Sequence, residues 1–318
     1  MKIEKLSPAF KDYIWGGVKL REVYGKPCDY DRVAESWELS THPAGPSRIS
    51  GGDLDGMELS EYFRLHPEVL GENCGTFDNF PVLIKFIDAK EALSIQVHPS
   101  DEYALKVEGE YGKTEMWYVM DCEPGAYLYF GVNREISQEE FRRRIADNTV
   151  EEVLNREEVH PGDVFFIESG TIHAIGAGIL ICEIQQNSNC TYRVYDYGRV
   201  GADGKPRELH VEKALAVSRL TPSDTSGRRE EAQSIPGGTR TRLASCKYFT
   251  TDKYEIDGAA AVEVDGSSFL SLIVMEGGGR LAGSENTVEF QAGDSLFVPA
   301  GSGKLEITGK CALAATQV

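Results

Sequence analysis

Four side chains of types that bind metal ions lie at three separate points of the chain. Gln96 and His98 are two residues apart in the segment LSIQVHPSD, so on a β-strand both side chains project from the same face. Glu115 lies in the segment GKTEMWYV, and His173 follows the glycine turn of ESGTIHAIGAG. In a closed barrel, inward positions on different strands converge on the interior. Two imidazoles, a carboxylate and an amide oxygen would there suit one Zn²⁺ per chain, or another divalent ion, with a coordination position left for water or substrate.

Each of the six histidines could also have a purely structural role. A histidine at a strand end is often a hydrogen-bonded core or surface residue, and that alternative applies to each histidine taken alone. His98 and His173 stand out because each lies at the junction of a strand and a turn. We expect structural roles for the four that lie beside prolines or in polar segments, His42, His66, His160 and His210.

A polar run, EIQQNSNCTYRVYDYGR, begins at Glu183. Glu183, Gln185 and Asn187 alternate along a predicted strand and would line an interior with polar groups. Arg193 and Arg199 follow, with tyrosines between them. Interior carboxylate and amide groups with arginines near the mouth of a barrel are typical of a pocket for a hydroxylated, anionic ligand. The alternative is an exposed edge strand with solvated arginines.

The elements that must position these residues are short apolar segments separated by Gly, Pro, Asn and Asp. Their lengths are those of β-strands, and their close spacing predicts a β-sandwich or barrel. Two helices interrupt the strands. One is predicted over residues 136–155, where apolar residues recur at helical spacing and Ser137 precedes Glu140 as in a capping box. A shorter helix is predicted over residues 59–65.

An internal repeat divides the chain. Residues 161–173 align without gaps with residues 292–304, at a constant offset of 131. Each copy predicts a Gly-Asp turn, an apolar strand, a glycine turn and a further strand. The spacing resembles the second motif of the cupin superfamily, with Glu168 where proline is usual in the first copy and Lys304 in place of the histidine in the second. We therefore predict a mainly β protein of two cupin-type jelly-roll units with a few inserted helices, and we place the chemistry in the first unit.

The predicted domain boundaries follow a polar stretch rich in Ser and Gly, TPSDTSGRREEAQSIPGGTR. We predict a catalytic cupin domain with an N-terminal extension and inserted helices over residues 1–225. A linker over 226–240 and a degenerate C-terminal cupin domain over 241–318 would follow.

Composition limits the classes of function. Lys and Arg total 33 and Asp and Glu total 51, which gives a formal net charge of −18. This charge disfavours nucleic-acid and membrane partners, but cations focused in one cleft can still bind a small anionic substrate.

No apolar run approaches the ~20 residues that span a bilayer, and the N-terminus lacks the apolar core of a signal peptide, so we expect a cytoplasmic protein. The seven cysteines form no CxxC pair and are expected to be small buried residues. The oligomeric state stays open.

Five segments together resemble type I mannose-6-phosphate isomerase (phosphomannose isomerase) in its short bacterial form. They are AESWELSTHPAGPS, LSIQVHPSD, GKTEMWYV, ESGTIHAIGAG and EIQQNSNCTYRVYDYGR. The resemblance implies a metal-dependent aldose–ketose isomerase that interconverts mannose 6-phosphate and fructose 6-phosphate. The family's zinc ligands fall on Gln96, His98, Glu115 and His173. The arginine implied to be catalytic falls on Arg193, and the positions implied to line the pocket fall on Glu183, Lys85, Ser94, Lys113 and Arg199.

The chemistry of this reaction fits these residue types. The proton moves between C2 and C1 through a cis-enediol(ate), and a divalent cation near the two sugar oxygens stabilises the charge that develops there. Arg193 and Lys113 would stabilise the same charge, and Glu183 is the candidate for proton transfer. The phosphate or sugar would be oriented by Lys85, Ser94 and Arg199.

The sequence departs from the family pattern at a few points, and two other classes of function stay open. The long insertions of the eukaryotic-type enzymes are absent, Arg199 stands where those enzymes carry lysine, and Thr114 stands where proline is more familiar. A cupin metalloenzyme such as a dioxygenase would use a similar ligand set with iron and would consume oxygen. A non-catalytic sugar-binding cupin would bind the phosphosugar without turnover. The first does not predict a cationic pocket beside the metal, and the second has little need of both a metal and an arginine.

Overall fold

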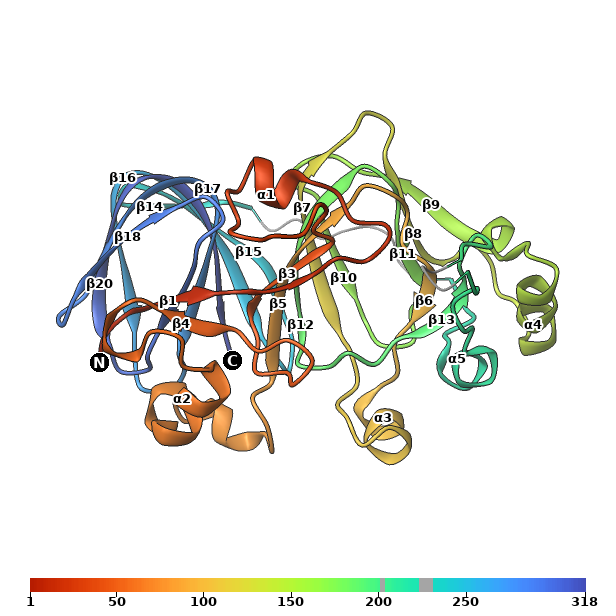
Figure 1. Cartoon of the computed structure of the whole chain (residues 1–318), viewed down its shortest axis with the longest axis horizontal. Helices are drawn as coiled ribbons and strands as arrows, with labels where there is room; N and C mark the ends of the chain where they lie inside the picture. The colour runs from red at the N-terminus through yellow and green to blue at the C-terminus, as the bar shows by residue number, and fades with distance from the viewer. Residues whose placement is uncertain (201–203, 223–230) are drawn as a thin grey trace.

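The computed structural model of the chain describes residues 1–200, 204–222 and 231–318 (Figure 1). Antiparallel strands dominate it and form three sheets, with a few short helices at the periphery. The predicted fold class, mainly β with inserted helices, is confirmed.

The first unit consists of two sheets that pack face to face. The larger has the strand order β10 (Val164–Ile167), β7 (Glu115–Cys122), β12 (Ile179–Gln186), β5 (Val82–Ala89), β3 (Glu35–Leu39) and β2 (Ala9–Lys11). The smaller has the order β13 (Tyr192–Tyr195), β6 (Ile95–Val97), β11 (His173–Ile175), β8 (Tyr127–Val132) and β9 (Leu154–Glu158). Trp117 and Ile181 of the larger sheet pack with Phe130 and Ile175 of the smaller sheet in one buried cluster. This cluster fills one part of the space between the sheets, and the polar site described below occupies another.

The second unit is one strongly curved sheet (Figure 1). Its order is β14 (Gln233–Ile235), β15 (Gly238–Ser245), β16 (Thr250–Val264), β20 (Gly303–Gln317), β17 (Leu270–Ala282), β19 (Ser295–Val298), β1 (Glu4–Ser7) and β4 (Arg48–Ser50), with β18 (Thr287–Gln291) paired to β17. The N-terminal strands β1 and β4 therefore belong to this sheet, although the sequence places the whole of 1–225 in the first domain. Pairing of β1 with β19 covers an edge that would otherwise expose unpaired backbone groups.

The span predicted as a linker, 226–240, contains ordered strands. Residues 226–230 lie outside the described residues, but β14 and the start of β15 form a hairpin in which Ile235 pairs with Gly238. Pro236 and Gly237 make the tight turn, and the φ of +79° at Gly237 is one that glycine adopts without strain. The Pro-Gly pair is therefore a hairpin turn rather than part of a linker.

The helices are short. They are α1 (Lys19–Glu22), α2 (Leu59–Leu65), α3 (Asp101–Val107), α4 (Gln138–Ala146) and α5 (Val211–Val217), with 3₁₀ turns at Gly52–Leu54, Pro67–Leu70, Asn73–Thr76 and Val150–Val153. The helix predicted over 59–65 is confirmed as α2, and Ser137 caps α4 by accepting a hydrogen bond from the backbone N–H of Glu140. The prediction of one helix over 136–155 is wrong at its C-terminal end. Asn148 has a φ of +56°, a left-handed conformation that commonly ends a helix, and the chain then enters β9.

The internal repeat is reproduced in the backbone hydrogen bonds. In the first copy Val119 N–H donates to the carbonyl of Asp163 over 2.9 Å, and Gly162 N–H donates back to Val119 over 2.8 Å. In the second copy Val274 and Asp294 form the equivalent bond of 2.9 Å, and Gly293 N–H donates to Val274 over 2.8 Å. The strands that follow, β10 and β19, occupy matching positions at the same offset of 131. The two units are thus two copies of one β architecture.

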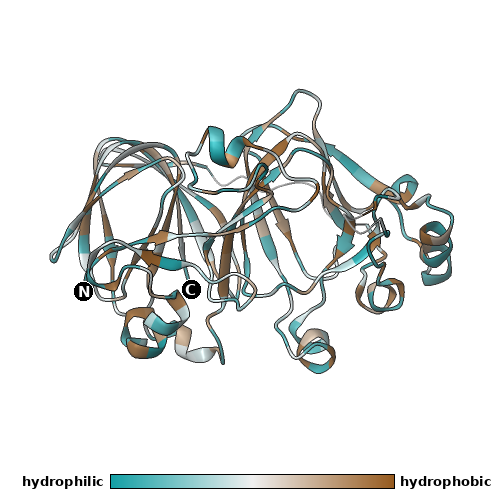
Figure 2. Cartoon of the chain, viewed as in Figure 1, coloured by the Kyte–Doolittle hydropathy of each residue, from teal (hydrophilic) through white to brown (hydrophobic). Residues whose placement is uncertain are grey.

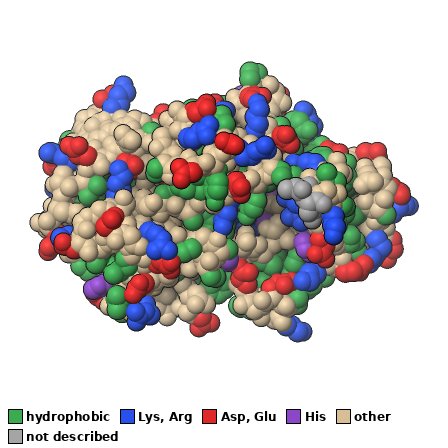
Figure 3. All heavy atoms as spheres, in the orientation of Figure 1, with side chains coloured by type: hydrophobic (Ala, Val, Ile, Leu, Met, Phe, Trp, Pro, Cys, Tyr) green, Lys and Arg blue, Asp and Glu red, His purple; other side chains and the backbone are tan. Residues whose placement is uncertain are grey.

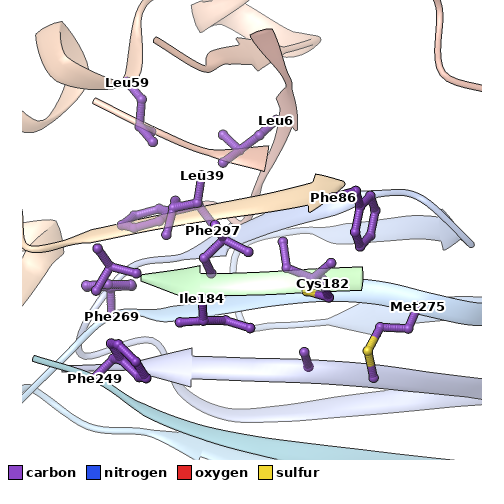
Figure 4. Close-up of a cluster of buried hydrophobic side chains, with 14 of the residues drawn as sticks. Leu6, Leu39, Leu59, Phe86, Cys182, Ile184, Phe249, Phe269, Met275 and Phe297 are labelled. Carbon is purple, nitrogen blue, oxygen red and sulfur yellow. The ribbon is translucent and has the colours of Figure 1, made fainter. Parts of the chain in front are cut away.

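A shared apolar core joins the two units (Figure 4). Phe86 and Ile184, on the outer face of the larger first-unit sheet, belong to the same buried cluster as Phe269, Met275 and Phe297 of the second unit. Figure 2 shows apolar residues concentrated along the strands and polar residues on the peripheral helices and loops. The larger sheet is therefore covered on both faces.

The molecular surface is charged and mixed. Figure 3 shows acidic and basic side chains interspersed over the visible face. Among the described residues, no helix combines the length and apolarity needed to cross a bilayer.

Candidate active site

Three of the predicted ligands meet in the interior of the first unit. His98 follows β6, Glu115 opens β7 and His173 opens β11, and their ligand atoms all lie within 4.8 Å of one another. The Nε2 atom of His173 lies 3.4 Å from Glu115 Oε1, and the Nε2 atom of His98 lies 3.6 Å from Glu115 Oε2. None of the three is more than 1% exposed. Gln96 pairs with His173 in the sheet, and its amide nitrogen lies 3.5 Å from His173 Nε2.

Both histidines are oriented by backbone carbonyl groups. His98 Nδ1 donates to the carbonyl of Cys190 over 2.9 Å, and His173 Nδ1 donates to the carbonyl of Thr171 over 2.8 Å. A carbonyl can only accept, so each Nδ1 carries the proton and each Nε2 presents a lone pair to the interior. Burial, followed by the nearby Lys113 ammonium, lowers the pKa of His98 to about 3, and burial also lowers the pKa of His173. Both rings are neutral at pH 7, which is the form that binds a metal.

The carboxylate of Glu115 completes a set of donors that fits a divalent ion. Its Oε1 atom is buried and has no hydrogen-bond partner, which is costly for an oxygen in the interior. Burial raises the pKa of Glu115, but the Lys113 ammonium together with the neighbouring His98 and His173 outweighs this effect, and the pKa lies well below its ordinary value. Two neutral imidazoles and one ionised carboxylate form a three-ligand set typical of an open, catalytic metal site.

A pocket of about 350 Å³ lies beside this centre. Its walls include six of the residues predicted from the sequence, Lys85, Ser94, Gln96, Lys113, Glu183 and Arg193. Lys113 connects the pocket to the centre because its Nζ lies 3.2 Å from His98 Nε2 and also contacts Glu115 Oε2. The structure therefore brings together the metal-binding and the polar residues that the sequence places far apart.

Lys85 and Glu183 line the pocket and belong to one row of side chains across the larger sheet. Trp37, Lys85, Glu183 and Trp117 are direct neighbours on β3, β5, β12 and β7. Trp117 Nε1 donates to Glu183 Oε2 over 2.8 Å, and Lys85 Nζ lies 3.4 Å from Glu183 Oε1. The alternation of strand side chains turns this whole row toward the pocket, while the residues on either side face the shared core.

Burial and charge set the protonation of this row. Burial, with repulsion from Glu115, raises the pKa of Glu183, and its Oε1 has no hydrogen-bond partner. Burial would lower the pKa of Lys85, but the carboxylates of Glu35 and Glu183 outweigh it and raise that pKa. A buried carboxyl group whose pKa is raised, beside a lysine that stays charged, is an arrangement suited to proton transfer.

The sequence as a whole was compared with families and proteins already known. Residues 3–127 match the model of the phosphomannose isomerase type I catalytic domain, and residues 239–318 match that of the mannose-6-phosphate isomerase cupin domain. The chain is 40% identical to mannose-6-phosphate isomerase ManA of Bacillus subtilis (strain 168) over 303 residues, which cover 95% of this chain and 94% of that protein. This chain belongs to the type I phosphomannose isomerase family. The resemblance seen in the sequence is confirmed.

Further relatives agree with this assignment. A mannose-6-phosphate isomerase of Streptococcus mutans is 38% identical over 286 residues, covering 90% of this chain and 89% of that protein. The crystal structure of the mannose 6-phosphate isomerase from Bacillus subtilis matches with a TM-score of 0.93 and 37% identity, covering both chains fully. Enzymes of this type I family depend on a metal ion, and the His98–Glu115–His173 cluster is the only group of metal-binding side chains found among the described residues.

The two predicted arginines differ in their position relative to the pocket. Arg193 lines the pocket, and its Nη1 donates to the carbonyl of Glu208 over 2.9 Å. Arg199, predicted to bind substrate, is not among the lining residues. Its guanidinium contacts the Asp196 carboxylate and donates to the carbonyl of Ala92.

Two charged residues of the pocket were not predicted from the sequence. Arg207 lines the pocket while its guanidinium pairs with both carboxylate oxygens of Asp196. Glu35 also lines the pocket, accepts a hydrogen bond of 2.6 Å from Trp37 Nε1 and lies 3.7 Å from Lys85 Nζ. Glu35 lies within AESWELSTHPAGPS, one of the segments that resemble the family, and this resemblance could have indicated it. Arg207 had none, because it lies in a polar stretch beyond the predicted strand.

Proposed function

We propose that this pocket interconverts mannose 6-phosphate and fructose 6-phosphate through a cis-enediol(ate), with Zn²⁺ held by His98, Glu115 and His173. The observation that carries the proposal is the buried His-Glu-His cluster opening, through Lys113, into a pocket with four cationic side chains. Gln96 is proposed as a further ligand because its side chain amide lies beside His173 Nε2. A divalent ion at this place would act as a Lewis acid toward the sugar oxygens on which charge develops.

The residues around the cluster are assigned to proton transfer and charge stabilisation. Glu183 has an unpartnered carboxylate oxygen at the pocket wall, and we assign it the movement of the proton between C2 and C1. Lys113 lies 3.7 Å from Glu183 Oε1, which places its ammonium between Glu183 and the metal ligands. With Arg193, whose buried Nε has no hydrogen-bond partner, it would stabilise the negative charge of the enediolate.

The phosphate is assigned to the mouth of the pocket. Arg207 presents a guanidinium there, and its pairing with Asp196 fixes its orientation. Lys85 and Ser94 line the same pocket and would orient the sugar or its phosphate. Arg199 is assigned an indirect part, because it contacts Asp196 and does not line the pocket.

The test is a coupled assay of fructose 6-phosphate formation from mannose 6-phosphate, combined with measurement of bound metal. We expect about one zinc per chain, loss of activity on chelation and recovery on addition of Zn²⁺. His98→Ala should lose both zinc and activity, whereas His160→Ala, at an exposed histidine outside the site, should lose neither. Full activity without metal, or oxygen consumption with no isomerisation, would overturn the proposal.

A further inference from the structure

The backbone register allows the active site of the first unit to be mapped onto the second unit. Gly170 N–H donates to the carbonyl of His98 over 2.8 Å, and Gly301 N–H, 131 residues later, donates to the carbonyl of Asp265 over 2.7 Å. Asp265 therefore occupies the position of His98. The strand pairing agrees, because Gln96 pairs with His173 in the first unit and Glu263 pairs with Lys304 in the second.

The pocket residues on the larger sheet of the first unit also have counterparts in the second unit. Val119 is opposite Ile181, and its counterpart Val274 is opposite Leu313, so Glu183 corresponds to Ala315, which is two residues beyond Leu313. Lys85 pairs with Glu183 in the first unit, and Asp252 pairs with Ala315 in the second. Glu35 is opposite Ile87 in the first unit, and Arg240 is opposite Tyr254 in the second. The pocket pair Glu35 and Lys85 is thus replaced by Arg240 and Asp252, with the two charges exchanged.

The second unit has a pocket at this equivalent position. It measures about 370 Å³, close to the 350 Å³ of the active-site pocket, and Arg240, Asp252, Tyr254, Glu263, Asp265 and Leu270 are among its walls. The duplication has therefore preserved the cavity, while the site residues that can be mapped onto the second unit have changed. This mapping makes the second cavity a counterpart of the active site rather than a surface irregularity.

The second pocket is not built for a metal ion or for a phosphate. Leu270 stands where Glu115 stands in the first unit, since each faces the end of the strand that follows the repeated turn. Among the described residues, the side chains of Asp252, Glu263 and Asp265 do not form a group close enough to share a metal. The walls carry one cationic and three anionic side chains, whereas the active-site pocket carries four cationic and two anionic ones. This balance of charge repels an anion.

The remaining groups are those that bind hydroxyl groups. Arg240 donates to Asp252 Oδ2 from Nε over 3.0 Å and from Nη2 over 2.6 Å, which fixes a planar donor beside a carboxylate acceptor. Ser267, Ser268 and Gln317 add neutral donors and acceptors to the walls. Tyr254 adds an aromatic ring, against which the C–H face of a sugar can pack.

We propose that the pocket of the C-terminal unit binds an uncharged hydroxylated ligand of the size of a free hexose. The cavity volume fits such a molecule, and the fixed Arg240–Asp252 pair offers a donor and an acceptor to neighbouring hydroxyl groups. The site is separate from the isomerase pocket and takes a ligand without the phosphate that the first pocket is arranged to hold.

The test is saturation-transfer NMR of the full-length, metal-loaded protein with D-mannose as the probe. Fructose 6-phosphate is present in excess, so that the active-site pocket is filled by the two phosphosugars at equilibrium. We expect D-mannose to bind under these conditions, and Arg240→Met to weaken binding at least about tenfold, as expected for loss of a charge-assisted contact. Asp252 keeps its pairing with Arg242 in that variant, so the fold is not left with an unpaired buried carboxylate.

Two further variants separate pocket binding from other effects. Ala261→Trp places a large ring at the pocket wall and should also abolish the signal, while Arg280→Met, at an exposed arginine outside the pocket, should leave it unchanged. The active-site variant Glu183→Gln should retain D-mannose binding, which keeps this result independent of the isomerase proposal. Absence of binding in excess phosphosugar, or binding that survives both Arg240→Met and Ala261→Trp, would overturn the assignment. Binding of inorganic phosphate that Arg240→Met removes would overturn the choice of an uncharged ligand.

Discussion

Replacement of Glu183 by glutamine isolates the proton-transfer step. The substitution keeps the size and shape of the side chain and removes only its charge and its ability to take a proton. The glutamine carbonyl can still accept the hydrogen bond from Trp117, and Lys85 keeps the Glu35 carboxylate at 3.7 Å. The fold should therefore persist, with an unchanged circular dichroism spectrum.

The expected effect follows from the position of the carboxylate. General acid–base catalysis contributes about 10²- to 10⁴-fold to a rate, which corresponds to about 3 to 5 kcal/mol of activation free energy. Glu183 is not one of the three clustered ligands, so zinc content should stay at the wild-type level. We expect kcat for mannose 6-phosphate to fall by at least about 100-fold, with a parallel loss of deuterium incorporation at C1 of fructose 6-phosphate in heavy water.

Glu35 provides a matched control because its surroundings are nearly the same. Each carboxylate accepts a hydrogen bond from a tryptophan Nε1, and each lies within 4 Å of Lys85 Nζ. Of the two carboxylates, only Glu183 also contacts Lys113, whose ammonium group contacts Glu115. Glu35→Gln should therefore change KM more than kcat. A kcat for Glu183→Gln within a few-fold of the wild type, with zinc retained, would refute the assignment of Glu183.

Two further predictions concern Asp196 and the two arginines that contact it. Arg207→Ala should raise KM for mannose 6-phosphate at least about tenfold, which is the cost of one charge-assisted contact. Arg199→Ala should raise KM less. Equal effects of the two substitutions on KM in steady-state kinetics would contradict the different roles assigned to Arg207 and Arg199. Burial raises the pKa of Asp196, but the donated hydrogen bonds of Arg207 and Arg199 outweigh burial and leave the pKa below its ordinary value of 3.8. A carboxyl group whose pKa is depressed by folding stabilises the protein above its unfolded pKa, and this stability is lost as the pH falls through the folded pKa. The melting temperature of the wild type should thus exceed that of Asp196→Asn at neutral pH, and scanning calorimetry should show the difference shrinking below about pH 4.

Much of the fold was predictable because its signals are local. Strand length, turn residues and the gapless repeat depend on neighbouring residues, and the repeat survives in the structure down to individual hydrogen bonds of Asp163 and Asp294. The clustering of His98, Glu115 and His173 was predictable for the same reason, since His98 directly follows β6 and His173 opens the strand after the repeated turn. Their convergence then follows from closure of the two sheets.

The errors arise where distant parts of the chain decide the outcome. Leu154 pairs with Val132 in a sheet, so the helix predicted over 136–155 cannot continue to its predicted end, and local helical spacing cannot reveal this pairing. The attachment of β1 to the second unit depends on an edge of β19, nearly 300 residues away in the chain. Arg199 and Arg207 both contact the Asp196 carboxylate, and only the folded structure shows that Arg207 also lines the pocket.

The duplicated unit has a structural part in the active site, apart from its own pocket. Lys85 and Glu183 face the substrate pocket, so the alternation of strand side chains turns Phe86 and Ile184 the other way, into the core shared with the second unit (Figure 4). Phe86 and Ile184 are both fully buried. Burial of each such side chain is worth about 1.5–3 kcal/mol, and without the second unit this face of the sheet would be open to water. The C-terminal unit therefore supports the strands that carry Lys85 and Glu183, which gives a physical reason why a copy without the His-Glu-His cluster remains joined to the one that has it.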